Sequence, residues 1–494
     1  MTKKAIVIGA GIAGIASAIR LTKKGYTVSV IEANDYPGGK LTSVQLGQYR
    51  FDAGPSLFTL PYLVDELFEL TGKNPRDYFN YRQLETLCHY FYEDGTTLHA
   101  YADREKLFQE VETKLNIVSR PLKEYLEHSE YLFERTRHSF LEKSLHKFSS
   151  YLSFDILKTV SSIRKLNLFE SMHEINHIRL NHPKLVQLFD RFATYNGSNP
   201  YKAPGVLNSI PHLEFGIGSF FPEEGMHQIL NACMKLAEEL KIEFHFGERV
   251  TAIETENKKV RGVTTQNGFY PAEIVVSNCD VKQTYKQLIP FQKAPEKTMN
   301  QEPSSSALIF YWGIKKTFPE LDIHNILFSE NYQEEFKCIF EDSTISDDPT
   351  VYIHVSSKMV PADAPEGCEN WFVMINVPSN QGQDWEKSRL KTRENCIRKI
   401  NRILKTDLES FIEKEDFLDP IRLEERTNSF AGALYGASSN DRMAAFFRHP
   451  NFSKIKGLYF AGGSVHPGGG IPLCLLSAKI ATELIPNAEF RIPN

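Results

Sequence analysis

The sequence predicts an α/β fold whose parallel-sheet domain is discontinuous. An apolar, β-branched run at residues 5–8 leads into a glycine motif at 9–14 and then into a helical pattern. A second apolar run at 457–461 leads into a glycine-rich loop at 462–470 and another helical pattern. Continuous apolar runs of this length are typical of strands buried in a parallel sheet. Because both ends of the chain carry this strand–loop–helix pattern, we expect them to meet in one sheet.

Composition excludes several other classes. The 494 residues include 57 basic and 62 acidic side chains, a net charge of −5, which is unlike the basic excess of a nucleic-acid-binding protein. The seven cysteines are odd in number and contain no C-x-x-C pair, so a disulfide framework and a zinc cluster are not expected. We therefore predict a cytoplasmic protein that binds no metal and no nucleic acid.

The N-terminal glycine motif has the spacing of a dinucleotide-binding fingerprint. Gly9 would make the tight turn, Gly11 would admit a diphosphate, and Gly14 would let the helix touch the strand. Ile12 and Ala13 begin the helix whose positive end would hold the phosphates. The next strand, 27–31, ends in an acidic residue eighteen positions after the last motif glycine, close to the spacing expected for a ribose ligand. That residue is Glu32.

Two further motifs decide which dinucleotide is expected. Gly38-Gly39-Lys40 follows the second strand, and Gly54-Pro55 ends a D-x-G-P motif. Together they resemble the glutathione-reductase-like flavoproteins, in the branch that holds amine oxidases and carotenoid desaturases. The resemblance implies FAD as the cofactor, with Lys40 at the diphosphate or ribityl chain.

The C-terminal loop is expected to approach the flavin ring. Five of the nine residues at 462–470 are glycine, which we interpret as close backbone approach to a flat ligand rather than packing. Its predicted flavin contacts are Gly463, Ser464, Gly470, Ile471 and Pro472. Pro472 marks the start of a helix, 473–484, whose free amides would stabilise negative charge on a reduced flavin.

Strand patterns at 242–246, 250–253, 260–263 and 273–278 complete the predicted FAD domain, which comprises 1–75, 225–290 and 455–494. In similar flavoproteins the position of Val250 lies beside the adenine. The remaining stretches, 76–224 and 291–454, are predicted to form a substrate domain. It would hold a mixed sheet, with strands near 305–314, 351–355 and 371–377, and a mostly helical region at 105–195.

Part of the helical region has an unusual charge. Residues 135–191 hold ten basic and five acidic side chains, interleaved with aromatic and aliphatic ones. We interpret this region as a membrane-facing subdomain on the inner face of the cell membrane, from which an apolar substrate enters. The alternative is an ordinary solvated helix surface.

Motifs outside the cofactor site resemble the bacterial, phytoene-desaturase-type carotenoid desaturases. They lie at 192–201, 210–216 and 221–226, and in the H-P-G-G-G-I-P run at 466–472. Within that family the sequence is most similar to the 1-hydroxycarotenoid 3,4-desaturases; a phytoene- or lycopene-type desaturase is the alternative. The loop departs from the family pattern by continuing P-L-C-L rather than ending in a further glycine, a change expected to alter the immediate surroundings of the flavin.

The implied reaction is hydride loss from a polyene to flavin N5. An allylic C–H is too weak an acid for side-chain bases, so hydride transfer would leave a delocalised cation that sheds a proton to a weak acceptor. We therefore expect positioning and cofactor electronics to dominate, with no strong general base. Glu214, His212 and His466 are the candidate proton acceptors, although a structural role is the favoured interpretation of all three. Oxygen and a quinone both remain open as the electron acceptor.

Two rival functions share part of this pattern. A flavin amine oxidase would frame a soluble amine between aromatic rings, for which Tyr195 and Tyr435 are the available residues. A lipid-carrying protein similar to the Rab GDP-dissociation inhibitors would have the fold without using a flavin. The C-terminal glycine loop argues against the carrier.

Overall fold

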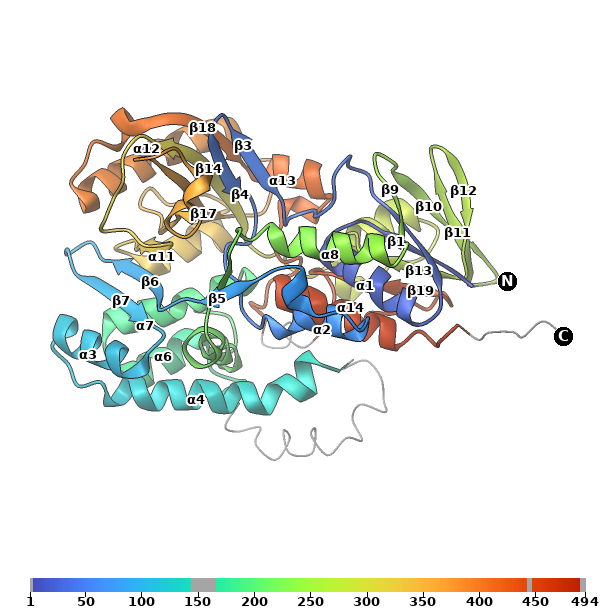
Figure 1. The fold of residues 1–494 in the computed structure, drawn as a ribbon. Helices are drawn as coiled ribbons and strands as arrows, with labels where there is room; N and C mark the ends of the chain where they lie inside the picture. Colours follow the sequence, from blue (N-terminus) through green and yellow to red (C-terminus); the bar gives the residue numbers. More distant parts are fainter. Residues whose placement is uncertain (1–2, 144–165, 442–446, 489–494) are drawn as a thin grey trace.

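The computed structural model describes residues 3–143, 166–441 and 447–488. A five-stranded parallel sheet, in the order β19–β13–β1–β2–β9, draws its strands from three distant stretches of the chain, as the sequence predicts. Figure 1 shows the blue N-terminal strands beside strands from the middle and the end of the chain. The strands are β1 (Lys4–Ile8), β2 (Thr27–Ile31), β9 (Glu243–His245), β13 (Ile274–Ser277) and β19 (Leu458–Phe460).

The core of this sheet is built by its apolar strands and the helix that follows β1. Four of the five residues in β1 are buried, and so are the first ten residues of α1 (Ile12–Lys23). Helix α1 packs against α2 (Tyr62–Leu70), α8 (Gln228–Glu239) and α14 (Ile471–Glu483). Because α14 lies on α1, the first and last helices of the chain are neighbours (Figure 1).

An antiparallel sheet adjoins the parallel one. Its strands are β10 (Val250–Glu256), β11 (Lys259–Thr265) and β12 (Gly268–Pro271). The predicted strands at 250–253 and 260–263 are confirmed, and both extend further than their apolar cores because antiparallel pairing continues into polar residues. A short antiparallel hairpin joins β3 (Ser43–Leu46) to β4 (Tyr49–Asp52), and a second antiparallel pair joins β5 (Tyr81–Gln83) to the distant β8 (Phe220–Pro222).

The second large unit is a mixed seven-stranded sheet, also as predicted. Its order is β18–β14–β17–β16–β15–β6–β7, with β15 and β6 parallel and the other neighbours antiparallel. Strand β14 is buried along its whole length and pairs with β17 over nine residues. The strands are β6 (Thr86–Phe91), β7 (Thr97–Tyr101), β14 (Ser306–Ile314), β15 (His324–Leu327), β16 (Val351–His354), β17 (Glu369–Val377) and β18 (Ile412–Leu418).

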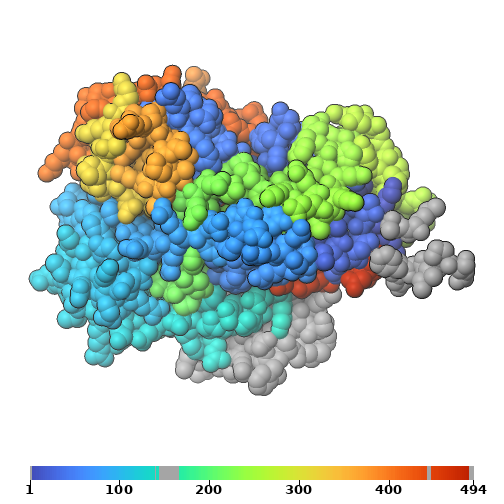
Figure 2. All heavy atoms as spheres, viewed as in Figure 1, coloured from blue at the N-terminus to red at the C-terminus, as the bar shows by residue number. Residues whose placement is uncertain are grey.

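Helices cover both faces of the mixed sheet. Helix α12 (Trp385–Leu404) packs its buried side on one face. The predicted helical region covers the other at β6 and β7; it contains α3 (Arg104–Leu115), α4 (Arg120–Thr136), α6 (Met172–Leu180), α7 (Pro183–Asp190), a 3₁₀ helix (Arg191–Asn196) and a π-helical turn (Arg137–Leu141), and a second π-helical turn (Leu213–Ile217) follows it in the chain. Figures 1 and 2 show this region, in cyan and green, as a separate lobe.

The remaining helices are short: α9 (Val281–Gln283), α10 (Glu296–Met299), α11 (Tyr332–Lys337) and α13 (Pro420–Thr427). No helix in the described ranges is long and apolar enough to span a membrane. Residues 144–165, the centre of the predicted membrane-facing stretch, lie outside the described residues.

Candidate active site

A single cavity of about 580 Å³ runs from the carboxyl ends of the parallel strands to the face of the mixed sheet. In open α/β sheets, ligands bind at that edge, outside the carboxyl ends of the strands. Sixteen of the seventeen predicted cofactor residues line the cavity: Gly9, Gly11, Ile12, Ala13, Glu32, Gly38, Gly39, Lys40, Gly54, Pro55, Val250, Gly463, Ser464, Gly470, Ile471 and Pro472. The sequence therefore identified the residues that converge on one site from both ends of the chain.

The remaining predicted residue, Gly14, serves the fold around the site. A Cβ atom at Gly14 would lie 2.1 Å from the carbonyl oxygen of Gly9, far inside contact distance. Helix α1 therefore touches the turn after β1 because residue 14 has no side chain, as the motif predicts. Gly9 itself has φ +95°, which favours glycine at the turn.

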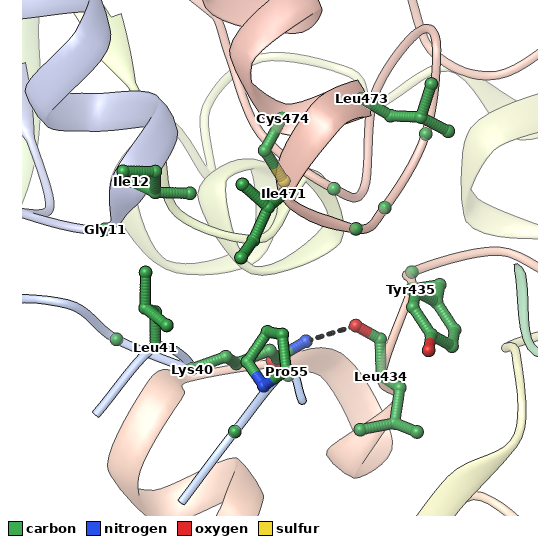
Figure 3. A pocket seen from close by; sticks show the side chains of 18 of the residues that line it. Gly11, Ile12, Lys40, Leu41, Pro55, Leu434, Tyr435, Ile471, Leu473 and Cys474 are labelled. Carbon is green, nitrogen blue, oxygen red and sulfur yellow. Dashed lines mark hydrogen bonds between the residues drawn. The ribbon is translucent and has the colours of Figure 1, made fainter. Parts of the chain in front are cut away.

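Two helix N-termini face the cavity without side-chain caps. Helix α1 begins after Gly11 and α14 after Gly470, and neither N-cap residue makes a side-chain hydrogen bond to its helix. Figure 3 shows Ile12 and Ile471, the first residues of the two helices, in the upper half of the view, with Pro55 in the lower half. The first amides of a helix and its dipole attract negative charge. The cavity thus presents two anion-attracting ends, as a diphosphate and an electron-rich ring edge require.

The Glu32 carboxylate is fixed at the end of β2. Its Oε2 accepts a hydrogen bond from the Ala10 amide at 2.7 Å, and its Oε1 accepts one from the Asn34 amide at 2.9 Å. The carboxylate therefore bridges the glycine motif and the segment after β2. Each oxygen keeps a further lone pair for a hydroxyl group, which suits the predicted contact with a ribose.

Lys40 supplies a cation to the same wall. Its Nζ donates to the carbonyl oxygens of Ala433 at 2.9 Å and Leu434 at 2.6 Å (Figure 3). Burial lowers the pKa of Lys40 to about 8, against the opposing effect of the nearby Asp280 carboxylate. Asp280 also lines the cavity, and burial raises its pKa. Lys40 thus spans the site and keeps one N–H for a ligand.

The C-terminal glycine loop corrects one expectation. Gly462 and Gly469 are required by packing: a Cβ at Gly462 would lie 2.5 Å from Asn278 Nδ2, and one at Gly469 would lie 2.6 Å from the Tyr435 ring. The interpretation that these glycines serve only ligand approach is therefore wrong for both positions. Gly470 differs, because its Cβ would meet nothing within 4 Å and its φ is +95°. At Gly470 the backbone itself is open to the cavity.

Arg448 is a site residue that sequence reasoning missed. Its Nη1 donates to the carbonyl oxygens of Tyr435 at 2.8 Å and Gly463 at 3.2 Å, and its Nη2 to that of Ala437 at 2.8 Å. Only 3% of the residue is exposed, and burial lowers the pKa of its guanidinium to about 10. Arg448 therefore connects the segment 435–437 to the glycine loop. No local motif marks it.

Cys474 lies within the electrostatic reach of both cations. Its side chain lines the cavity near the start of α14 (Figure 3). Burial raises the pKa of the Cys474 thiol to about 11, although the charges of Lys40 and Arg448 act in the opposite direction. The group is therefore a neutral thiol at physiological pH.

The three candidate proton acceptors separate in the structure. Glu214 lines the cavity and is 2% exposed, and burial raises the pKa of its carboxyl group. His212 and His466 are not among the lining residues. The His212 ring packs on Phe133, and burial lowers its pKa, whereas His466 Nε2 lies 2.9 Å from the Lys143 carbonyl oxygen. Glu214 is the candidate that the geometry brings to the site.

The arm of the cavity beyond the glycine loop is walled by apolar side chains. They come from the mixed sheet and from the helical region: Leu87, Phe133, Leu141, Leu207, Ile210, Leu213, Ile309, Ile326, Phe372 and Met374. Apolar walls of this kind bind an apolar ligand by removing its surface from water.

A possible metal group lies elsewhere. Among the described residues, Glu334, Cys338 and Asp342 are the group whose ligand atoms lie within 4.8 Å of one another, and the two acidic residues are exposed. None of the three lines the cavity. The expectation of a metal-free site stays a prediction.

Together, the parallel sheet, the two uncapped helices and the joined cavity have the architecture of a dinucleotide-binding protein. A family model described as flavin containing amine oxidoreductase matches residues 12–486, so the chain belongs to that family. It is 54% identical over 488 residues to a 1-hydroxycarotenoid 3,4-desaturase from Flavobacterium sp. (strain P99-3), covering 99% of this chain and all of that protein.

A second relative and a solved structure are also similar to this chain. The chain is 32% identical to a 4,4'-diapolycopene oxygenase from Methylomonas sp., with 98% of both chains covered. Its fold is similar to that of cyclohexylamine oxidase from Brevibacterium oxydans IH-35A, with a TM-score of 0.64, 15% identity and coverage of 98% of this chain and 99% of that one. The protein is an FAD-dependent oxidoreductase.

The site fits this cofactor on its own geometry. Uncapped helix ends, the Lys40 amino group and the open backbone of Gly470 all face one cavity that also holds Glu32. We expect the nucleotide half to lie between Glu32 and Val250, and the ring half between Pro55 and the start of α14.

Proposed function

We propose that the protein is a carotenoid desaturase that introduces a C–C double bond into a long polyene, with 3,4-desaturation of a 1-hydroxycarotenoid as the specific reaction. The observation that carries the proposal is the continuity of the cavity. One space is bounded at one end by the cofactor residues and at the other by apolar side chains. Relatives that cover nearly the whole chain are named for carotenoid substrates.

The chain's own residues supply position rather than strong acid–base chemistry. The bound flavin would accept a hydride from the substrate. Apolar walls hold the polyene and exclude water, while α1, α14 and Lys40 hold the cofactor in register with it. Of the three candidate residues Glu214 alone lines the cavity, where burial raises the pKa of its carboxyl group and Tyr195 and Arg191 hold it in place.

The geometry disfavours the amine-oxidase alternative at one point. Tyr435 lines the cavity and lies over Gly469, as an aromatic wall would. Tyr195, its suggested partner, instead donates a hydrogen bond to Glu214 and accepts one from Arg191. The two rings therefore have different environments and do not form a pair around an amine. The family match to flavin-containing oxidoreductases argues against the lipid-carrier alternative.

The test is a substrate panel. Purified FAD-loaded protein is incubated with phytoene, lycopene, 1-hydroxy-carotenes and a set of primary amines, with oxygen or a quinone as acceptor. Product spectra should shift to longer wavelength for a 1-hydroxy-carotene, because desaturation lengthens the conjugated chain. A product from phytoene or lycopene instead would show a carotenoid desaturase with a different substrate. Oxidation of amines alone would overturn the proposal.

Peripheral membrane association is a second part of the proposal. A long polyene is stored in lipid, and the described part of the helical region exposes apolar side chains: Phe169 is 65% exposed and Ile178 is 70% exposed. The cavity walls include Phe133 from α4 and Leu141 from the turn that follows it. We propose that this region rests on the inner face of the cell membrane and that the substrate enters beside α4.

Liposome co-sedimentation tests this part. The protein should sediment with vesicles containing acidic lipid and less with neutral vesicles, and a Phe169→Ser, Ile178→Ser variant should sediment less with both. Leu390→Ser is the matched control, because Leu390 is exposed on α12 across the mixed sheet. Equal recovery of the wild-type protein in the supernatant with all vesicles would end the membrane proposal.

A further inference from the structure

A polar cluster stands in the wall of the apolar arm. Arg191 and Tyr195 come from the 3₁₀ helix after α7, and Glu214 comes from the π-helical turn at 213–217. All three line the cavity. Arg191 Nη1 donates to the Tyr195 hydroxyl oxygen at 2.9 Å, and its Nη2 donates to the Tyr90 hydroxyl oxygen at 2.8 Å. The Tyr195 hydroxyl in turn donates to Glu214 Oε1.

The cluster is not satisfied by its own members. Glu214 Oε2 lies 3.8 Å from Arg191 Nη2, beyond hydrogen-bond distance. Arg191 Nε is buried without a hydrogen-bond partner among the described residues. Arg191 and Glu214 are only 7% and 2% exposed. Leaving a buried ionic group under-bonded is costly, so the arrangement suits a polar ligand group that completes it.

The chemistry of the cluster restricts that group. Glu214 would repel a carboxylate group on the ligand, and Arg191 would repel an ammonium group. A hydroxyl group is neutral, donates one hydrogen bond and accepts others, so it suits a carboxyl oxygen beside a guanidinium. The surrounding walls are aliphatic and aromatic, which limits the rest of the ligand to hydrocarbon.

We propose that Arg191, Tyr195 and Glu214 form the binding site for the terminal hydroxyl group of the polyene substrate. Glu214 Oε2 accepts a hydrogen bond from this hydroxyl group, while Arg191 and Tyr195 hold the carboxyl group of Glu214 in place. This inference rests on the proposed function, because it identifies the end of the polyene that the apolar arm selects. A relative's name places a hydroxyl group in its substrate, and no comparison assigns residues to it.

A second group of polar contacts begins beside Pro55, at the cofactor end of the same cavity. Ser56, next to Pro55, has its Oγ 2.7 Å from the Tyr352 hydroxyl oxygen, and that hydroxyl lies 2.8 Å from His324 Nδ1. All three side chains line the cavity, as does the cluster. Because the cluster and the cofactor residues line one cavity, a hydroxyl group held at Glu214 would fix how far the polyene advances and which C–C bond reaches the cofactor. The site would set the position of desaturation as well as substrate choice.

The test compares a 1-hydroxy-carotene with the same carotene lacking the hydroxyl group. Binding of each is measured on the FAD-loaded protein by quenching of tryptophan fluorescence, without electron acceptor, and turnover is measured separately. The variants are Glu214→Gln and Tyr195→Phe. Glu130→Gln is the matched control, because that exposed glutamate on α4 lies outside the cavity. Thermal unfolding and FAD content check that each variant is folded.

The wild-type protein and Glu130→Gln should bind the hydroxylated polyene at least about tenfold more tightly than the other one, a ratio typical of one hydrogen bond to a buried charged group. Tyr195→Phe should reduce the ratio, and Glu214→Gln should bring it close to one while leaving the affinity for the non-hydroxylated polyene unchanged. A wild-type ratio near one, or an equal loss for both polyenes in the variants, would overturn the site. Hydroxyl-dependent binding without turnover would instead contradict the proposed function and leave the site standing.

Discussion

Lys40 and Leu434 are joined by a hydrogen bond of 2.6 Å, from Nζ to the carbonyl oxygen, although nearly four hundred residues separate them in the chain. The bond crosses from the segment after β2 to the segment that precedes the C-terminal glycine loop (Figure 3). It holds the two walls of the cavity together at the cation that we expect to meet the cofactor.

The Lys40 charge predicts a pH-dependent affinity for FAD. With a pKa of about 8 in the protein alone, Lys40 is protonated below that pH. A diphosphate beside it raises the pKa, so the affinity is fully present below about pH 8 and declines as the pH rises above it. Fluorescence titrations of the apoprotein at about pH 7 and about pH 9.5 should show a weaker affinity at the higher pH, by up to tenfold per pH unit. Lys40→Met should bind weakly at both pH values, and an unchanged pH dependence in this variant would assign the effect to another group.

Gly14 should not tolerate a side chain. A Cβ 2.1 Å from the Gly9 carbonyl oxygen must displace backbone, so Gly14→Ala should lower the free energy of unfolding by about 3 kcal/mol. The same change should lower FAD content, because Gly9 and α1 both border the cavity. Denaturant unfolding monitors the first effect, and Lys23→Ala, at an exposed position of the same helix, is the control. A Gly14→Ala protein as stable as the wild type would contradict this prediction, because it would show that α1 can move away from the turn at Gly9 without cost.

Arg448 should hold the glycine loop by its three hydrogen bonds. Arg448→Met leaves the carbonyl oxygens of Tyr435, Ala437 and Gly463 without their donors, which should cost about 2 to 4 kcal/mol of unfolding free energy. It also removes a buried positive charge from the cavity wall. The flavin reduction potential should therefore fall by about 30 mV or more, a tenfold change in the reduction equilibrium. Arg448→Lys keeps the charge, so its potential should stay near that of the wild-type protein even where stability is lost.

The two histidines should prove dispensable for the chemical step. His212 and His466 do not line the cavity, so replacing either by glutamine should change kcat by less than about tenfold when FAD remains bound. Glu214→Gln should likewise retain turnover of a non-hydroxylated polyene. A loss of several orders of magnitude in kcat at any one of these residues, with the flavin still bound, would reveal a strong general base that the account lacks.

The cofactor end could be predicted from sequence because its residues follow local rules. Gly9, Gly11 and Glu32 stand at fixed distances along one β–α–β unit, and the helix starts at Ile12 and Ile471 are marked by glycine and proline. The same local reasoning failed for Gly462 and Gly469. Their neighbours, Asn278 and Tyr435, come from other parts of the chain, so nothing in the loop itself signals a packing role.

The substrate end shows the limit more clearly. Glu214 was a candidate by residue type alone, and its partner Arg191 lies on a different helix. Arg448 is anchored by backbone carbonyl groups, which every residue has and no sequence pattern marks. Only the packing of the helical region on the mixed sheet brings such groups to one wall. Asn278 and Asp280 are intermediate: they follow β13 at the edge where ligands bind, a signal that strand prediction alone could have used.

The most direct test of the account is an anaerobic single turnover with FAD-loaded protein and a 1-hydroxy-carotene in equal amounts. The oxidised flavin absorbance should bleach while the polyene band shifts to longer wavelength, with one new double bond formed for each flavin reduced. Bleaching by an amine while the polyene stays unchanged would contradict the claim that the cofactor and the apolar arm serve one reaction.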